Sequence, residues 1–206
     1  GPTTIKYVGN TACVHVRLNS GNNIIFDAGT GIRELGMRMI QHDEPLLLLL
    51  SHGHWDHIQG YPFFGPIYQP GREIRVCQGV ESNAVALKAI LEQMDGSNFP
   101  VHSEDLPSTI TTVQQVDDYL NQQSFKTIRK QLNHPGGGNA YRIEEDGVSV
   151  AYITENELDE IAIESAKYFK SKSSAIGSYI AAEGLTFDLS SRHDTTVSTI
   201  NLFDNS

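Results

Sequence analysis

Residues 46–57 read LLLLLSHGHWDH, five leucines followed by a serine and then by three histidines and one aspartate within six residues. A short run that is apolar throughout is typical of a strand buried on both faces, although a buried helical turn has the same composition. If the run is a strand, the histidines lie where it emerges into a loop, and functional sites are often built at such places. The stretch therefore predicts a site at the end of a buried strand.

The spacing of the polar side chains in this stretch favours metal binding. In an extended segment the side chains of His52 and His54 point the same way, and imidazole nitrogens are good zinc ligands. A tight turn at Trp55 would carry Asp56 and His57 toward a second ion, at the roughly 3.5 to 4 Å separation of two-metal hydrolases. The alternative is an accidental surface cluster. Crowded imidazolium groups repel one another and are costly to bury, so we favour the metal.

The segments on both sides of this stretch predict a layered α/β fold. Alternating or apolar runs predict strands at Thr11 to Leu18, Asn22 to Phe26, Ile74 to Gln78, Ile110 to Val116, Phe125 to Leu132, Ala140 to Glu144 and Val148 to Thr154. Helical spacing predicts helices at Ile32 to Ile40, Ser82 to Met94 and Leu158 to Phe169, and again around Ala175 to Ala182. The first two strands are expected to form a hairpin, because a turn-forming cluster separates them.

Size and charge limit the classes of function. The 206 residues suffice for one substantial core, and the formal net charge of −10 disfavours a broad grip on a nucleic-acid backbone. No run approaches the roughly 20 apolar residues of a membrane span. We expect Cys13 and Cys77 to be buried free thiols. With no leader evident, we expect a cytoplasmic protein.

The sequence around the histidines resembles a known family. SHGHWDH at 51–57 resembles the HxHxDH signature of the metallo-β-lactamase superfamily. Residues 2–13, FDAGTGIRELG at 26–36, HGHWDHIQGYPFF at 52–64 and HPGGGNAYRI at 134–143 look like successive blocks of its bacterial phosphodiesterase-like hydrolases. The resemblance implies an αββα sandwich of two mixed sheets with outer helices. It covers residues 1–157, so we expect residues 158–206 to be a remodelled or incomplete C-terminal part of the same domain.

The resemblance also implies which residues hold two metal ions. His52, His54 and His134 would hold the first ion, and Asp56 and His57 the second. Glu155 occupies the place of the family's bridging aspartate, and the alternative for it is an exposed acidic residue at a strand end. His193, after the late strand Leu185 to Leu189, is the only candidate for the final histidine ligand, with a surface histidine as the favoured alternative.

Two further features are implied behind and beside the metals. Asp27 would accept a hydrogen bond from a ligand histidine and fix its tautomer, or it could simply form the turn before Ala28 and Gly29. The backbone amides of Gly136, Gly137 and Gly138 would bind a substrate oxyanion or phosphate, unless the three glycines only make a turn.

The function implied is hydrolysis of a phosphodiester in a small nucleotide-like substrate by a metal-bridging hydroxide, with Asp56 as the general base. The two divalent ions would be zinc, with manganese or iron as alternatives. Two rival functions stay open: hydrolysis of a thioester or lactone, and a non-catalytic sensory or binding module of the same fold. We expect no extended nucleic acid and no membrane as partner, and a homodimer is compatible with the sequence.

Overall fold

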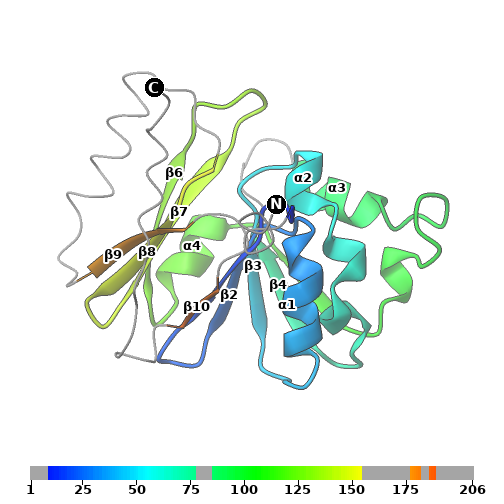
Figure 1. The fold of residues 1–206 in the computed structure, drawn as a ribbon, viewed down its shortest axis with the longest axis horizontal. Helices are drawn as coiled ribbons and strands as arrows, with labels where there is room; N and C mark the ends of the chain where they lie inside the picture. Colours follow the sequence, from blue (N-terminus) through cyan, green and yellow to red (C-terminus); the bar gives the residue numbers. More distant parts are fainter. Residues whose placement is uncertain (1–8, 78–84, 155–176, 182–185, 189–206) are drawn as a thin grey trace, which may run out of the picture.

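The protein consists of two facing β-sheets with helices packed outside them. The computed structural model describes residues 9–77, 85–154, 177–181 and 186–188. Figure 1 shows the four-stranded sheet on one side of the six-stranded sheet and three helices, α1, α2 and α3, on the other side. This arrangement confirms the predicted α/β class and agrees with the sandwich of two sheets that the family resemblance implied.

The larger sheet has the strand order β10-β1-β2-β3-β4-β5. Its strands are β1 (Val14–Arg17), β2 (Asn23–Phe26), β3 (Leu46–Leu49), β4 (Glu73–Cys77), β5 (Thr109–Val113) and β10 (Thr186–Asp188). β1 and β2 are antiparallel, as expected for the predicted hairpin, and every other pair of neighbours is parallel. The leucine run is therefore a strand in the middle of a mixed sheet, as predicted.

The smaller sheet has the order β6-β7-β8-β9. Its strands are β6 (Lys126–Gln131), β7 (Asn139–Glu145), β8 (Val148–Tyr152) and β9 (Gly177–Ala181). The first three strands form an antiparallel meander and β9 joins β8 in parallel, so this sheet is mixed as well. The turn at Asp146 and Gly147 has positive φ angles at both residues, which suits a tight hairpin connection.

Two apolar layers follow from the alternation of side chains along the buried strands. In β3, Leu46 and Leu48 pack with α1 and α3, whereas Leu47 and Leu49 face the smaller sheet. Phe26 of β2 stacks on Tyr152 of β8, with ring centroids 5.0 Å apart. A strand buried on both faces needs an uninterrupted apolar run, which is why the five leucines identify the centre of the sheet.

Each helix packs its apolar side chains against a sheet or a neighbouring element. They are α1 (Gly31–Met39), α2 (Trp55–Ile58), α3 (Val85–Glu92) and α4 (Val116–Asn121), with single 3-10 turns at Tyr61–Phe63, Gly65–Tyr68 and Ser103–Asp105. α1 buries Ile32, Leu35 and Met39, the stripe predicted for a helix there. α3 lies within the helix predicted at residues 82–94 and ends two residues before the predicted end.

Two predictions of secondary structure are wrong. Val116 begins helix α4 and is not part of the preceding strand, which ends at Val113. The reasons are that Asp117 and Asp118 favour a helix N-terminus and that Val116 and Leu120 are buried one turn apart. The helix predicted around residues 175–182 is strand β9, because pairing with the edge of β8 outweighs local helical spacing.

Other expectations meet the structure in part. Strand β10 lies inside the predicted late strand at residues 185–189, and the helix predicted at 158–169 falls outside the described residues. The domain boundary at residue 157 stays a prediction. Cys13 and Cys77 are buried free thiols as predicted, and burial raises the pKa of the Cys77 thiol to about 12. Within the described residues, no helix combines the length and apolar character needed to cross a membrane.

Candidate metal centre

The histidine cluster occupies the loop that joins β3 to α2. His54 is the residue before α2 and has an extended backbone, with φ −66° and ψ 151°, and the chain then turns into the helix at Trp55. His52 and His54 therefore precede the turn, while Asp56 and His57 lie within the helix. The tight turn predicted at Trp55 is present. The first half of the motif is therefore extended, and the second half is helical.

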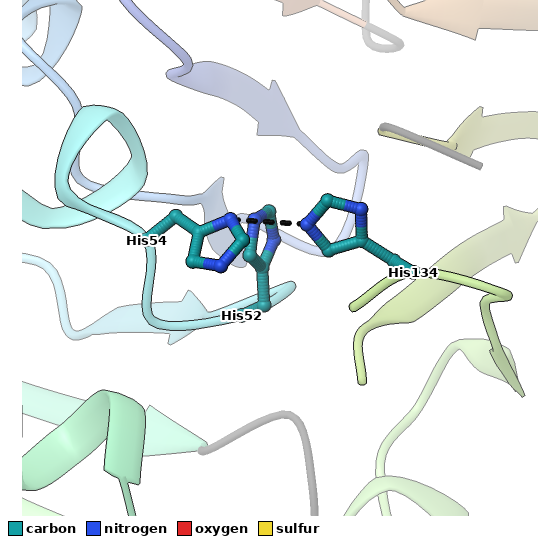
Figure 2. A group of neighbouring side chains, drawn as sticks. All are labelled: His52, His54 and His134. Carbon is teal, nitrogen blue, oxygen red and sulfur yellow. Dashed lines mark hydrogen bonds between the residues drawn. The ribbon is translucent and has the colours of Figure 1, made fainter. Parts of the chain in front are cut away.

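Three histidine rings from two distant segments meet at this loop. Potential ligand atoms of His52, His54 and His134 all lie within 4.8 Å of one another, and Figure 2 shows the His134 ring facing the other two. His134 Nε2 lies 3.0 Å from His54 Nδ1. His52 is buried, His134 half-buried and His54 exposed, so the group has one side in the protein and one side in solvent.

The loop between β6 and β7 brings His134 to the other histidines. The loop ends where β7 begins, and there the backbone N–H of Asn139 donates to the carbonyl oxygen of Ser51 at 2.9 Å. Gly138 packs against His52, where a Cβ on the glycine would come 3.7 Å from the Cβ of the histidine. A direct backbone contact between β7 and the histidine loop thus holds the β6–β7 loop, and His134 with it, beside the other histidines.

Asp56 and His57 form a second group beside the three rings. His57 Nε2 lies 3.3 Å from Asp56 Oδ2, and the rings of His57 and His52 have centroids 4.1 Å apart. His57 is buried, whereas the side chain of Asp56 is 47% exposed. The structure thus brings together all five ligand candidates of the HxHxDH motif and the β6–β7 loop.

A fully buried carboxylate, Asp27, organises the loop from behind. It follows β2 and has a φ of 56°, an uncommon angle that aspartate tolerates better than most residues. Its Oδ1 accepts from the backbone N–H of Ser51 at 2.6 Å, and its Oδ2 accepts from the Ser51 hydroxyl at 2.6 Å and from the Tyr152 hydroxyl at 2.7 Å. His57 Nδ1 lies 2.7 Å from the same Oδ2. Asp27 therefore connects both sheets with the histidine loop.

These contacts determine how the two buried histidines carry their protons. A carboxylate only accepts, so Nδ1 of His57 carries a proton. The Ser51 hydroxyl donates its proton to Asp27, so its oxygen accepts from Nδ1 of His52 at 3.0 Å. His52 Nδ1 therefore also carries a proton. Nε2 of each ring is then the nitrogen left for a metal, which is how a carboxylate behind a metal site prepares imidazoles for coordination.

Close backbone contact holds Asp27 and α2 together. The N–H of Ala28 donates to the His57 carbonyl at 2.7 Å, and the N–H of Gly60 donates to the Ala28 carbonyl at 2.8 Å. Gly29 has no room for a side chain, because a Cβ there would collide with the carbonyl oxygens of Asp56 and Ala12. Packing therefore requires glycine at position 29, in addition to any part that Gly29 has in the turn.

The donor set fits a divalent metal. Bonds of about 2.0 to 2.1 Å in a tetrahedral zinc site place two nitrogens roughly 3.3 Å apart, close to the 3.0 Å between His134 Nε2 and His54 Nδ1. At the second group, His57 Nε2 lies 3.3 Å from the Asp56 carboxylate. That separation also suits a cation bound by both groups. The residues present thus fit the ions that the fold implies.

Some predicted site residues are not placed by the structure. Glu155 and His193 lie outside the described residues, so their ligand roles stay predictions. Gly136 and Gly137 both have positive φ angles, and the N–H of Gly137 already donates to the His134 carbonyl at 2.8 Å. That bond favours the turn-forming interpretation for Gly137, and substrate binding by Gly136 and Gly138 stays a prediction.

Sequence reasoning missed two residues that position the site. Ser51 was visible directly before His52, but its role depends on the place of Asp27, which is 24 residues away in the sequence. Tyr152 ends β8 and reaches Asp27 across the two sheets. No local signal marks it, because an aromatic residue at the end of a strand is usually a packing residue.

Comparisons with known proteins agree with this geometry. The family model described as "Beta-lactamase superfamily domain" matches residues 22–168. Human tRNase Z, short form, shares 12% identity, with 86% of each chain covered and a TM-score of 0.51. A diphosphatase from the PhnP family shares 13% identity over 81% of this chain and 70% of its own, with a TM-score of 0.47.

A third solved structure, zinc-bound PqqB from Methylobacterium extorquens, shares 16% identity over 78% of this chain and 56% of its own, with a TM-score of 0.41. A search of curated proteins gave no match. At such low identities, similarity to solved structures is evidence for the fold alone. The family model, however, covers well over half of the sequence. The chain therefore belongs to the metallo-β-lactamase superfamily.

Proposed function

We propose that this chain is a dinuclear metal-dependent hydrolase that cleaves a phosphodiester bond in a small nucleotide-like substrate. The observation that carries the proposal is the convergence of the His52, His54 and His134 ligand atoms within 4.8 Å, beside the paired Asp56 and His57. Five ligand candidates from two segments of the chain meet at one partly exposed place, where a substrate has access. A site that only stabilised the fold would be closed to solvent.

The residues of the chain would divide the work as follows. His52, His54 and His134 would hold one ion, and Asp56 and His57 the other. When bound, two divalent ions supply an activated water and neutralise negative charge that develops on the substrate. Asp56, with about half of its side chain exposed, would orient the attacking water and accept its proton on the carboxylate.

Charge supports a phosphodiester as the substrate. The formal net charge of −10 would repel an anion, so an anionic substrate needs a local positive centre, which metal ions at the histidine cluster would provide. The fold is also that of human tRNase Z, whose name denotes a nuclease acting on transfer RNA. For this chain we propose a smaller substrate, because the net charge does not favour contact with a long nucleic-acid backbone.

Metal analysis combined with an esterase assay tests the proposal. We expect about two ions per purified chain and turnover of bis-p-nitrophenyl phosphate, with both reduced in His54→Ala and in Asp56→Asn. His42→Ala is a matched control, since His42 is an exposed histidine, with 55% of its side chain accessible, outside the cluster. That variant should keep metal and turnover.

Two results would contradict the proposal in different ways. Turnover of a thioester or lactone without turnover of any phosphodiester would identify a carbonyl hydrolase with the same metal site. Absence of metal, or metal without turnover of any ester, would favour a non-catalytic binding or sensory module of this fold.

A further inference from the structure

A pocket of about 570 Å³ opens directly beside the histidine loop. Gly53 and Trp55 of the loop line one side, and Ala89 and Glu92 of α3 line another. α2 and α3 lie next to each other, as Figure 1 shows, and α3 packs so closely on the loop that a Cβ on Gly53 would come 3.1 Å from the Cα of Ala86. The volume falls in the range typical of small-molecule sites.

Trp55 is the most prominent side chain of this pocket. Its indole is 62% exposed, although a tryptophan usually buries most of its surface. In the sequence it lies between two ligand candidates, His54 and Asp56, and Gly53 of the same loop also lines the pocket. A large aromatic surface kept in solvent at the edge of a site is typical of a residue that a ligand covers.

Acceptors predominate among the polar side chains of the pocket. The Gln93 side-chain amide nitrogen is occupied, since it donates to the carbonyls of Ile58 and Ile90 at 3.0 and 3.1 Å, which leaves its oxygen to accept. The Asn98 amide nitrogen donates one of its two N–H groups to Asp95 at 3.2 Å, and the amide oxygen is a further acceptor. Glu92 adds a carboxylate that pairs with Lys88 at 3.4 Å on the same helix, and no lysine or arginine is among the described residues of the lining.

These observations describe a site for a flat heterocycle and not for a phosphate. Acceptors repel phosphate oxygens but bind the N–H groups of an aromatic base, while the indole can stack on its face. We propose that Trp55 stacks on the nucleobase of the substrate and that the acceptors of the pocket select bases with an exocyclic amino group. This inference rests on the proposed function, because it assumes that the scissile phosphate lies at the histidine cluster.

Fluorescence gives a direct test, because Trp55 is the single tryptophan of the chain. Adenosine and cytidine 5′-monophosphates should quench the emission of the purified protein in a saturable way, since a stacked base quenches indole. Ribose 5-phosphate, which has no base, should not, and uridine 5′-monophosphate should require higher concentrations. Absence of saturable quenching, or equal quenching by ribose 5-phosphate, would overturn the proposal, and equal affinity for the uridine nucleotide would refute the selection for amino groups.

Substrate specificity provides a second, independent test. Stacking on an aromatic residue changes affinity by roughly 5- to 150-fold. Trp55→Ala should therefore lower, by a factor in that range, the ratio of kcat/KM for adenosine 5′-(p-nitrophenyl phosphate) to that for methyl p-nitrophenyl phosphate. Trp55→Phe should restore part of the ratio. Met37→Ala, which removes a similarly exposed apolar side chain outside the pocket, should leave it unchanged.

The two proposals fail separately. Hydrolysis of bis-p-nitrophenyl phosphate without quenching by any nucleotide would refute the base pocket and leave the hydrolase intact. Saturable quenching without hydrolysis of any ester would refute the hydrolase and leave a base-binding pocket. An unchanged specificity ratio in Trp55→Ala would also count against the pocket, whatever the absolute rates.

Discussion

The two ends of β2 both carry a buried histidine contact, but only one end forms a candidate metal site. At the amino end, His15 Nε2 lies 3.0 Å from the Asn23 side-chain oxygen, and both residues are less than 9% exposed. At the carboxyl end, Asp27 connects to Ser51, His52 and His57. Among the described residues, the only group with metal-binding spacing is the one at the carboxyl end.

The difference shows what makes a buried histidine a candidate ligand. The amino end has the His15–Asn23 pair beside a pocket of about 220 Å³ that is lined also by Arg17, Arg38 and Glu44, so the two arginines outnumber the one carboxylate and disfavour a cation. The carboxyl end has a buried carboxylate that fixes the tautomers and a loop from the second sheet that adds another ring. Burial alone therefore does not identify a histidine as a metal ligand. A metal site is indicated where several histidines converge and a buried carboxylate contacts their rings.

The largest effect should come from His52→Ala at the carboxyl end. Loss of this buried ligand should remove one of the bound ions and lower phosphodiester turnover by more than about 100-fold, beyond the usual effect of changing a supporting residue. Elemental analysis and steady-state kinetics measure both quantities. If His15→Leu at the amino end reduced metal content as much as His52→Ala, the contrast between the two ends would be wrong.

Asp27→Asn should have the next largest effect. The amide keeps the size of the side chain but cannot accept from Ser51, Tyr152 and His57 together, so both ring orientations are loosened. We expect a 10- to 100-fold loss of metal affinity, measured by competition with a chelator, with the folded state checked by circular dichroism. An affinity equal to that of the unaltered protein would show that Asp27 only shapes the turn.

Ser51→Ala should have a smaller effect at the same place. The variant removes the link between Asp27 and His52 but keeps the direct contact of Asp27 with His57. We expect a loss of metal affinity near the lower limit for supporting residues, about 10-fold. Ser51→Thr retains the hydroxyl and should restore most of the affinity. A threonine variant as weak as the alanine variant would argue against the proposed chain of hydrogen bonds.

The smallest functional effect is expected at the amino end. His15→Leu should leave metal content and turnover unchanged, because the His15–Asn23 pair is separated from the site by the length of β2. It should lower the free energy of unfolding by about 1 to 3 kcal/mol, because the buried Asn23 loses a hydrogen-bond partner. Urea denaturation measures this change. Unchanged stability would mean that water replaces the lost partner.

Most of the fold was predictable where burial repeats in the sequence. Hydrophobic patterns match the strands at three places: the leucine run at residues 46–50, the hairpin, and the meander of β6 to β8. The reason is that successive side chains of a strand point to opposite faces, so burial leaves a regular pattern in the sequence. Strand β9 was not predictable in this way. Its partner is the open edge of β8, and the pairing that makes it a strand involves residues far away in the sequence.

The candidate site divides in the same manner. The three histidines and the aspartate of residues 52–57 are adjacent along the chain, so their spacing alone indicated a metal centre. His134 was found through family resemblance, and its approach to His54 depends on contact between the two sheets. Nothing in the sequence indicated a role for the Trp55 side chain, because only the folded protein shows that the residue is exposed and lines a pocket.

The amino-acid sequence by itself determined the buried central strand, the layered α/β class and the chemical nature of the ligands, because these depend on residues that are close along the chain. The tertiary structure alone decided which nitrogen of His52 and His57 faces the site, which carboxylate supports them and which surface a substrate meets. The physical reason is that a hydrogen bond acts over about 3 Å in space. In the candidate site, the residues that share one are up to 125 positions apart in the sequence.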